Sequence, residues 1–178
     1  MAILGVDDFK SKLTGGGTRA NLFKVEMGWP AGIAAGASES EVGGFLIKGA
    51  QLPASIIGPI MVPFRGRQLQ IAGDRTFEPW SITIINDTNF VLRNAFEQWM
   101  NLINNHNANT GATDPADYFA DATVHQLDKD GTSLKSYSFR GLWPTNVSAI
   151  DLSYDTADTI EEFTVELQVQ YWESDTTS

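Results

Sequence analysis

The sequence predicts a mainly β protein with one α-helix, an α+β fold. Two antiparallel sheets are expected to pack as a barrel-like sandwich with the helix at its flank. Several stretches of the 178-residue chain alternate apolar and polar residues with period two, as strands with one buried face do. Only residues 89–104 repeat their apolar positions with the period of a helix.

The chain opens with an arm, a strand and a long loop. Residues 1–20 are predicted to be an arm whose triple glycine lacks the residues of a phosphate loop. Residues 21–27 are the first predicted strand. Residues 29–44 are small and partly acidic, and loops of this length in a compact domain are usually functional or mobile. This loop is therefore the first candidate for an interaction surface.

Two apolar runs follow the loop. Residues 45–52 predict a strand that ends at Pro53. Residues 56–64 are apolar but contain one glycine and two prolines, so this segment must be kinked or lie at a sheet edge.

The centre of the chain, residues 62–87, predicts a β-hairpin. Alternation marks its strands at 68–72 and 80–85. Residues 73–79 between them are rich in turn formers, and Pro79 cannot donate to a ladder just before the second strand.

The predicted helix at 89–104 carries one wide apolar stripe. Asp87 or Thr88 can cap its first turn, and Asn105 with His106 can end it. The stripe is interpreted as core packed on a sheet rather than as a ligand pocket. It comprises Leu92, Ala95, Phe96, Trp99, Leu102 and Ile103.

The second half predicts further strands. The Asp-Gly turn at 128–131 is expected to join two of them, and 162–172 alternates strictly enough to predict the longest strand. The predicted elements are strands at 122–127, 133–140 and 147–154, a corner at 142–144, a turn at 155–158 and the strand 162–172.

Composition excludes several kinds of chemistry. The chain has no cysteine, so disulfides, thiolate metal sites and thiol catalysis are excluded, and two histidines are too few for an imidazole metal cluster. No nucleophile elbow, zinc-protease motif or dinucleotide fingerprint occurs. We therefore predict no catalysis, no metal and no cofactor. No signal peptide or membrane-spanning apolar run is expected either.

The net charge of −10 lies entirely in the second half. Residues 1–89 hold eight Lys/Arg and eight Asp/Glu, whereas residues 90–178 hold four and fourteen. Tight nucleic-acid binding needs clustered cations, which this chain lacks. The acidic half would repel a polyanion, or serve solubility alone.

Four segments in order match a known family: NLFKVE at 21–26, IAGDRTFEPWSITIIND at 71–87, GLWPTNV at 141–147, and FTVEL through YWE at 163–173. With them the chain resembles the tail tube proteins of contractile-tailed bacteriophages over residues 21–173. The resemblance implies fold and assembly roles, not ligand binding, for the matching positions. These are Gly73, Asp74, Arg75, Thr76, Phe77, Trp80, Trp143, Pro144, Thr145, Asn146, Tyr171, Trp172 and Glu173.

The resemblance further implies a structural virion protein that is assembled in the host cytoplasm. Its homohexameric rings would join their sheets into a ring-wide inner barrel and stack helically into a hollow tube inside a contractile sheath. The implied partners are further copies, the sheath protein, a tape-measure protein and a baseplate initiator, with no membrane. DNA would pass through the lumen without specific binding, and acidic side chains lining the lumen would keep the DNA from sticking.

The resemblance also leads us to expect particular domain boundaries and subunit contacts. Residues 1–20 would be an arm, 21–173 one β domain and 174–178 a tail. The arm and the long loop would make ring-to-ring contacts, with candidate contact residues Trp29, Pro30, Glu39, Glu41 and Phe45.

Other readings remain open on sequence alone. The tube could belong to a phage-like bacteriocin or a contractile injection or secretion system that passes protein effectors. A monomeric β-sandwich binding module that uses the 29–44 loop is a different class, and a small enzyme is the remotest alternative.

Overall fold

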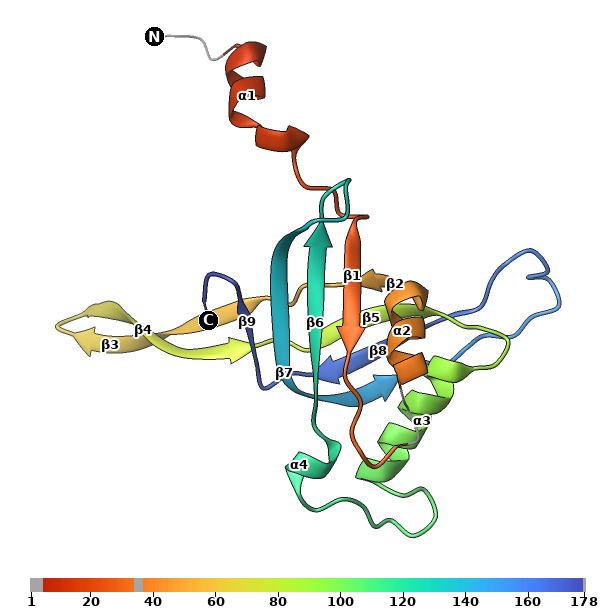
Figure 1. Ribbon diagram of the computed structural model, residues 1–178. Coiled ribbons are helices and arrows are strands. Elements are labelled where there is room, and N and C mark those ends of the chain that lie inside the picture. The colour runs from red at the N-terminus through yellow and green to blue at the C-terminus, as the bar shows by residue number, and fades with distance from the viewer. Residues whose placement is uncertain (1–4, 34–36, 178) are drawn as a thin grey trace.

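The computed structural model describes residues 5–33 and 37–177 and shows a two-layered β body with two projections (Figure 1). The described residues contain nine strands, with four α-helices and a 3-10 turn in place of the one predicted helix. The helical elements are α1 (Val6–Lys12), η1 (Thr14–Gly16), α2 (Ala37–Leu46), α3 (Val91–Ile103) and α4 (Pro115–Tyr118). The strands are β1 (Phe23–Met27), β2 (Ile47–Ala50), β3 (Ser55–Phe64), β4 (Arg67–Phe77), β5 (Trp80–Ile85), β6 (Ala120–Leu127), β7 (Ser133–Val147), β8 (Glu162–Gln168) and β9 (Tyr171–Ser174).

The body is a seven-stranded antiparallel sheet in the order β1-β6-β7-β8-β5-β2, with β9 also paired to β7. Strand β7 belongs to both layers, because its first half pairs with β6 and β9 and its second half pairs with β8. In Figure 1 the β1 and β6 strands run across the direction of β5 and β8. The expected two packed antiparallel sheets are thus confirmed, and the single chain forms no closed barrel.

Helix α3 fills the core as predicted. Its buried side chains are Leu92, Ala95, Phe96 and Trp99. Asp87 caps it, since its Oδ1 accepts a hydrogen bond from the Val91 amide at 2.9 Å. The Trp99 indole donates to the Tyr118 carbonyl at 2.7 Å, so its one polar atom is satisfied inside the core.

Helix α2 corrects two predictions. It occupies residues 37–44 of the segment read as a loop (29–44) and the first two residues of the predicted strand 45–52, of which only Ile47–Ala50 is strand. Its glycines and small residues give weak local helix preference, so tertiary packing decides the conformation. The helix packs against β1 and α3, and the Ser40 hydroxyl donates to the Met27 carbonyl at 3.0 Å.

The predicted central hairpin is wrong in its pairing. β4 pairs with β3, whereas β5 pairs with β8 and β2. The tight turn is Arg65–Gly66, where both residues have positive φ (43° and 83°), as a two-residue hairpin turn requires. The segment 73–77, read as a turn, is extended strand. The irregularity predicted for 56–64 is confirmed, since the β3–β4 register shifts between Ile57 and Pro59.

Two further strand predictions fail near the C-terminus. Of the predicted strand 147–154 only Val147 is strand, as the last residue of β7, and 148–154 belong to a long connection. The predicted strand 162–172 is two strands, β8 and β9. The chain leaves β8 after Gln168, and the Gln170 amide donates to the Arg140 carbonyl at 3.1 Å. The longest strand is therefore β7, with 15 residues. The apolar-polar alternation continues through the break, so periodicity could not reveal it.

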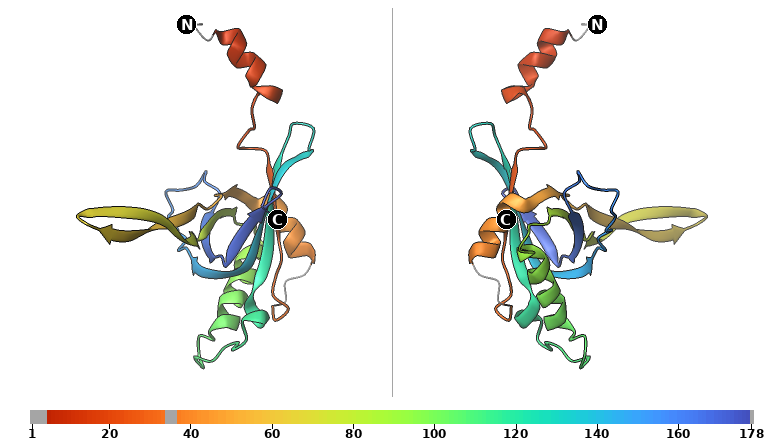
Figure 2. Two further views of the ribbon diagram at one scale, coloured as in Figure 1. Left: turned by 90° about the vertical axis from the view of Figure 1, so that its left-hand side faces the viewer. Right: turned by 90° about the vertical axis from the view of Figure 1, so that its right-hand side faces the viewer.

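Two elements stand away from the body. The β3–β4 hairpin projects from one side and α1 from another, as the views in Figure 2 also show. No side chain of α1 is buried.

Candidate assembly surface

The β3–β4 hairpin carries eight of the large apolar side chains that are exposed in the described chain. Its strands form a continuous antiparallel ladder with each other. Cross-strand neighbours Ile60–Ile71 and Val62–Leu69 lie two residues apart and so share one face. These four side chains are 40–60% exposed. A lone two-stranded hairpin is marginally stable in water, so this one requires a covering surface.

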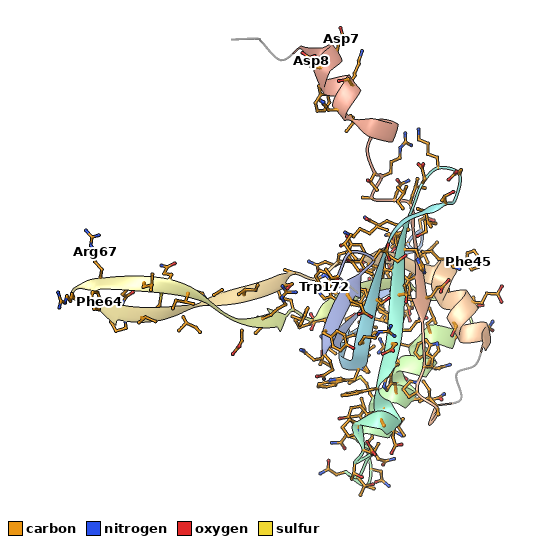
Figure 3. All side chains as sticks on the ribbon, turned by 60° about the vertical axis from the view of Figure 1, so that its left-hand side comes forward. Asp7, Asp8, Phe45, Phe64, Arg67 and Trp172 are labelled. Atoms are coloured by element: carbon orange, nitrogen blue, oxygen red, sulfur yellow. The ribbon has the colours of Figure 1, made fainter. Side chains whose placement is uncertain are left out.

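The opposite face of the hairpin is apolar in part as well. Met61 is 45% exposed and, as the neighbour of Ile60 in β3, points the other way. Phe64, at the tip, shares the face of Ile60 and Val62 by alternation, is 68% exposed and is seen far from the body in Figure 3. Exposed apolar surface of this extent marks a protein interaction site rather than a solvated strand pair.

The matched residues 73–77 lie on β4, at the half of the hairpin nearer the body. Gly73 is held close to β3: a Cβ there would lie 2.7 Å from the Gly58 carbonyl oxygen, so a larger side chain would displace the strand. Asp74, Arg75 and Thr76 are exposed. These three are thus free to meet another surface, whereas Gly73 serves strand pairing.

The base of the hairpin is anchored by aromatic residues. The Phe77 ring lies 6.1 Å from that of Trp172 on β9, in an edge-to-face arrangement, and Tyr137 on β7 lies 5.9 Å from the same indole. Trp172 marks this junction in Figure 3. The structure therefore brings together two matched segments that are far apart in sequence.

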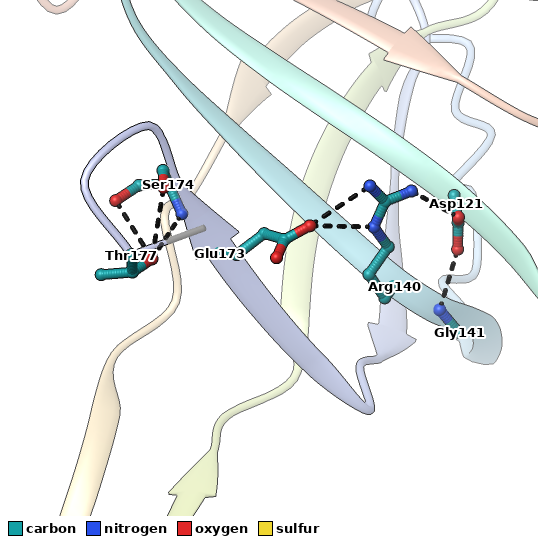
Figure 4. Close-up of polar contacts among 6 residues, drawn as sticks. All are labelled: Asp121, Arg140, Gly141, Glu173, Ser174 and Thr177. Carbon is teal, nitrogen blue, oxygen red and sulfur yellow. Dashed lines mark hydrogen bonds and ion pairs between the residues drawn. The ribbon is translucent and has the colours of Figure 1, made fainter.

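Glu173 holds β9 to the sheet through Arg140. The Arg140 guanidinium donates to Glu173 Oε1 at 3.2 Å and to Asp121 Oδ2 at 2.8 Å (Figure 4). The hydrogen bond to Asp121, and to a smaller extent that to Glu173, raises the pKa of Arg140 above its usual value. Beyond this pair, Ser174 and Thr177 close a small turn, with the Ser174 amide donating to Thr177 Oγ1 at 2.8 Å.

Trp80 and the 143–146 segment are parts of the body. Trp80 is fully buried and stacks on Phe139 at 4.6 Å between ring centroids. Pro144 is buried, and the β7–β8 register shifts between Pro144 and Asn146, which leaves Thr145 in a bulge. Thr145 Oγ1 donates to the Glu166 carbonyl at 3.1 Å. The predicted corner is thus a bulge within one strand, and Trp143 and Asn146 flank it.

The candidate ring-contact residues fall into two groups. Trp29 packs edge-on against Phe96 and Trp99, and Pro30 is buried, so both support the core. Glu41 is exposed on α2, and Phe45 is 82% exposed on the outer side of that helix (Figure 3). The side chain of Glu39 lies outside the described residues.

Sequence reasoning missed the hairpin itself and the role of Arg140. The run 56–64 was identified as an irregular edge, but its pairing with β4 was not. Nothing in the sequence links Arg140 to Glu173, because their proximity depends on the β7–β9 register.

The described residues hold no group of three potential metal ligands of the His, Cys, Asp or Glu types. None of their helices has the length and apolar character to cross a membrane.

Comparison with known proteins identifies the family of the chain. The sequence profile of the family described as phage tail tube protein matches residues 18–175. The chain belongs to the phage tail tube protein family. The role of this tail tube protein is therefore structural and not enzymatic, and it is a component of the virion.

Curated relatives agree with the family. The tail tube protein gp19 of Enterobacteria phage T4 is 35% identical over 170 residues, which cover 94% of this chain and 99% of gp19. The tail tube protein of Serratia phage KSP90 is 31% identical over 165 residues, covering 92% and 93% of the two chains.

Solved structures of lower identity share the fold. A chain of the anti-feeding prophage baseplate superposes with a TM-score of 0.65 at 11% identity, covering 89% of this tail tube protein and 95% of that chain. A chain of the PVC sheath-tube complex in its extended state superposes with a TM-score of 0.62 at 13% identity, covering 93% and 96%.

Proposed function

We propose that this tail tube protein forms homohexameric rings that stack helically into a hollow tube, the conduit for DNA ejection. The observation that carries the proposal is the β3–β4 hairpin, whose apolar face has no cover within the described chain. Copies of the same chain, joined in a closed ring and stacked, would cover it repeatedly. The edge strands β1 and β2 are the places where sheets of neighbouring subunits could join into an inner barrel.

Some of the residues matched to the family would then stabilise the fold, and others would contact neighbouring subunits. Gly73, Phe77, Trp80, Trp172 and Glu173 would hold the hairpin and β9 in place, as their contacts suggest. The exposed residues 74–76, with Glu41 and Phe45 on α2, would be available to neighbours. Residues 21–173 would act as one assembly unit, with 1–20 as an arm and 174–178 as a tail.

The implied partners extend beyond copies of the chain. We propose that the tube lies inside a contractile sheath, starts on a baseplate initiator and assembles around a tape-measure protein. A tube that passes protein effectors is the second candidate. The phage function is favoured because the relatives at 31–35% identity are phage proteins, whereas the injection-system chains match at 11–13%.

Sedimentation velocity tests self-assembly. Purified protein should shift, as its concentration rises, from a species near 19.5 kDa to rings and then to heterogeneous, rapidly sedimenting polymers. A single monomeric species at every concentration, even with a baseplate seed, would favour the binding-module alternative.

We also propose that the outward face of β8 and β5 lines the lumen. The inward face of β8 carries the buried Phe163, Val165 and Leu167, so Glu162 and Glu166 point the other way. Their register neighbours on β5 include Ser81, opposite Glu166. A polar, acidic wall would repel phosphates and let DNA slide.

Reversing one of these charges gives a direct prediction. Tubes of the unsubstituted protein should leave short duplex DNA in the supernatant on pelleting, whereas Glu166→Lys tubes should retain several-fold more because the net charge of each subunit rises by two. Asp130→Lys, on the β6–β7 turn, is the matched control. Equal DNA retention by all three proteins would contradict the acidic-lumen proposal.

A further inference from the structure

The tip of the hairpin combines an exposed aromatic ring with two free cations. Phe64 is 68% exposed, and the Arg65 guanidinium carbon lies 5.4 Å above its ring. Neither Arg65 nor Arg67 has an ion-pair partner within residues 5–33 and 37–177. Arg65 also adopts the left-handed region and lies in the turn, outside the paired ladder. The tip therefore offers an apolar group and positive charge to a partner.

The connection between β7 and β8 has the complementary character. Residues 148–162 contain five carboxylates and no lysine or arginine. Of these, Asp151, Asp155 and Asp158 have no cationic partner within the described part of the chain. The same connection exposes Leu152 (84%), Tyr154 (106%) and Ile160 (67%).

This connection curves around an open hollow. The hollow has a volume of about 840 Å³ and is lined by residues 149–154, 156 and 159–162, among them Ile150, Leu152, Tyr154 and Ile160, while Asp155 and Asp158 lie on the same connection between lining residues. An aromatic side chain with flanking guanidinium groups suits such a site, because the ring can lose water in the hollow while the cations meet carboxylates at the rim.

The two surfaces project from opposite sides of the body in Figure 1, the hairpin on the left and the β7–β8 connection on the right. They therefore do not meet within one chain. A contact between two different surfaces of identical subunits is heterologous, and such contacts propagate into open helical assemblies.

We infer that the hairpin tip of one copy inserts into the acidic hollow of a copy in the adjacent ring. This inference rests on the proposed ring-stacking function and names the two surfaces that would join successive rings. Arg65 and Arg67 would pair with Asp151, Asp155 or Asp158, and Phe64 would occupy the hollow between Leu152 and Ile160.

Charge reversal tests the pairing. Two double variants should each need a roughly tenfold higher protein concentration to form tubes, because like charges would face one another across the contact. They are Arg65→Glu/Arg67→Glu on the hairpin tip and Asp155→Arg/Asp158→Arg on the β7–β8 connection. The protein carrying all four substitutions should recover most of the lost tube assembly, since opposite charges again face one another with their positions exchanged. Lys129→Glu/Lys135→Glu, on and beside the β6–β7 turn, is the matched control and should assemble as the unsubstituted protein does.

Introduced cysteines give an independent readout, because the natural chain has none. Under mild oxidation of assembled protein, Arg65→Cys/Asp155→Cys should give a ladder of disulfide-linked multimers, whereas the control Arg65→Cys/Asp130→Cys should remain monomeric on denaturing gels.

The outcomes separate the two proposals. Tubes that tolerate reversal at the tip, or a disulfide ladder that is equal in both cysteine pairs, would overturn the inference and leave ring stacking intact. Absence of rings and tubes from the unsubstituted protein would overturn the proposed function and this inference with it.

Discussion

Replacing Ile60, Val62, Leu69 and Ile71 together by threonine should abolish tube formation and leave the body folded. These four side chains form the exposed apolar face of the hairpin. If each substitution removes about 1 kcal/mol of apolar burial free energy at a subunit contact, the four together lower the affinity of that contact by roughly a thousandfold. Threonine keeps the β preference of the strands, so their pairing should persist.

The control lies on the opposite face of the same strand. Gln68→Thr/Gln70→Thr changes two exposed polar residues of β4 and should leave tubes intact. Polymer yield after pelleting and the thermal midpoint of the non-assembled protein are the two measurements. Polymerisation of the four-threonine protein at the same concentration as the unsubstituted protein would contradict this role of the hairpin. A large fall in the thermal midpoint would contradict it too, because the loss of tubes would then reflect unfolding of the body.

Trp80→Ala should produce the largest loss of stability among single substitutions at the matched positions. Trp80 is fully buried, and its ring stacks on Phe139 with an interplanar angle of 9°. Truncating a buried tryptophan removes its transfer free energy and leaves a cavity, at a cost of about 3–5 kcal/mol in the free energy of unfolding. The pair joins β5 to β7, so the loss falls on the packing of the two layers.

Urea unfolding followed by circular dichroism, at a concentration too low for assembly, measures this effect. Low concentration is needed because polymerisation would add its own stabilisation. Tyr154→Ala, at a fully exposed position, should change the free energy of unfolding by less than about 0.5 kcal/mol. A loss below about 1 kcal/mol for Trp80→Ala would contradict the role assigned to this stack.

The parts of the fold that the sequence predicted well are those whose signal is local. The apolar stripe of α3 and its Asp87 cap are both present in the structure, because a helix of 13 residues records its buried face in its own spacing. The Asp-Gly turn after β6 is present for the same reason, with the Gly131 amide donating to the Asp128 carbonyl at 3.0 Å.

The errors concern pairing. Alternation at 68–72 and 80–85 identifies strands but not partners, and the true turn, Arg65–Gly66, lacks the Asn-Gly or Asp-Gly signature of a tight hairpin. The break between β8 and β9 is likewise invisible, since Val169 stays buried and keeps the apparent period.

The candidate assembly surface was only partly predictable. Matched residues such as Trp80, Phe77 and Trp172 stood out in the sequence, but they support the surface from within. The exposed hairpin residues looked like an ordinary apolar strand pair, because burial within a chain and burial between chains select the same residue types.

Negative-stain electron microscopy of the concentrated, unsubstituted protein tests the central claim most directly. We expect rings with six subunits in end-on views and hollow tubes of uniform bore in side views. Particles that remain single domains of about 20 kDa in the presence of a baseplate seed would contradict it.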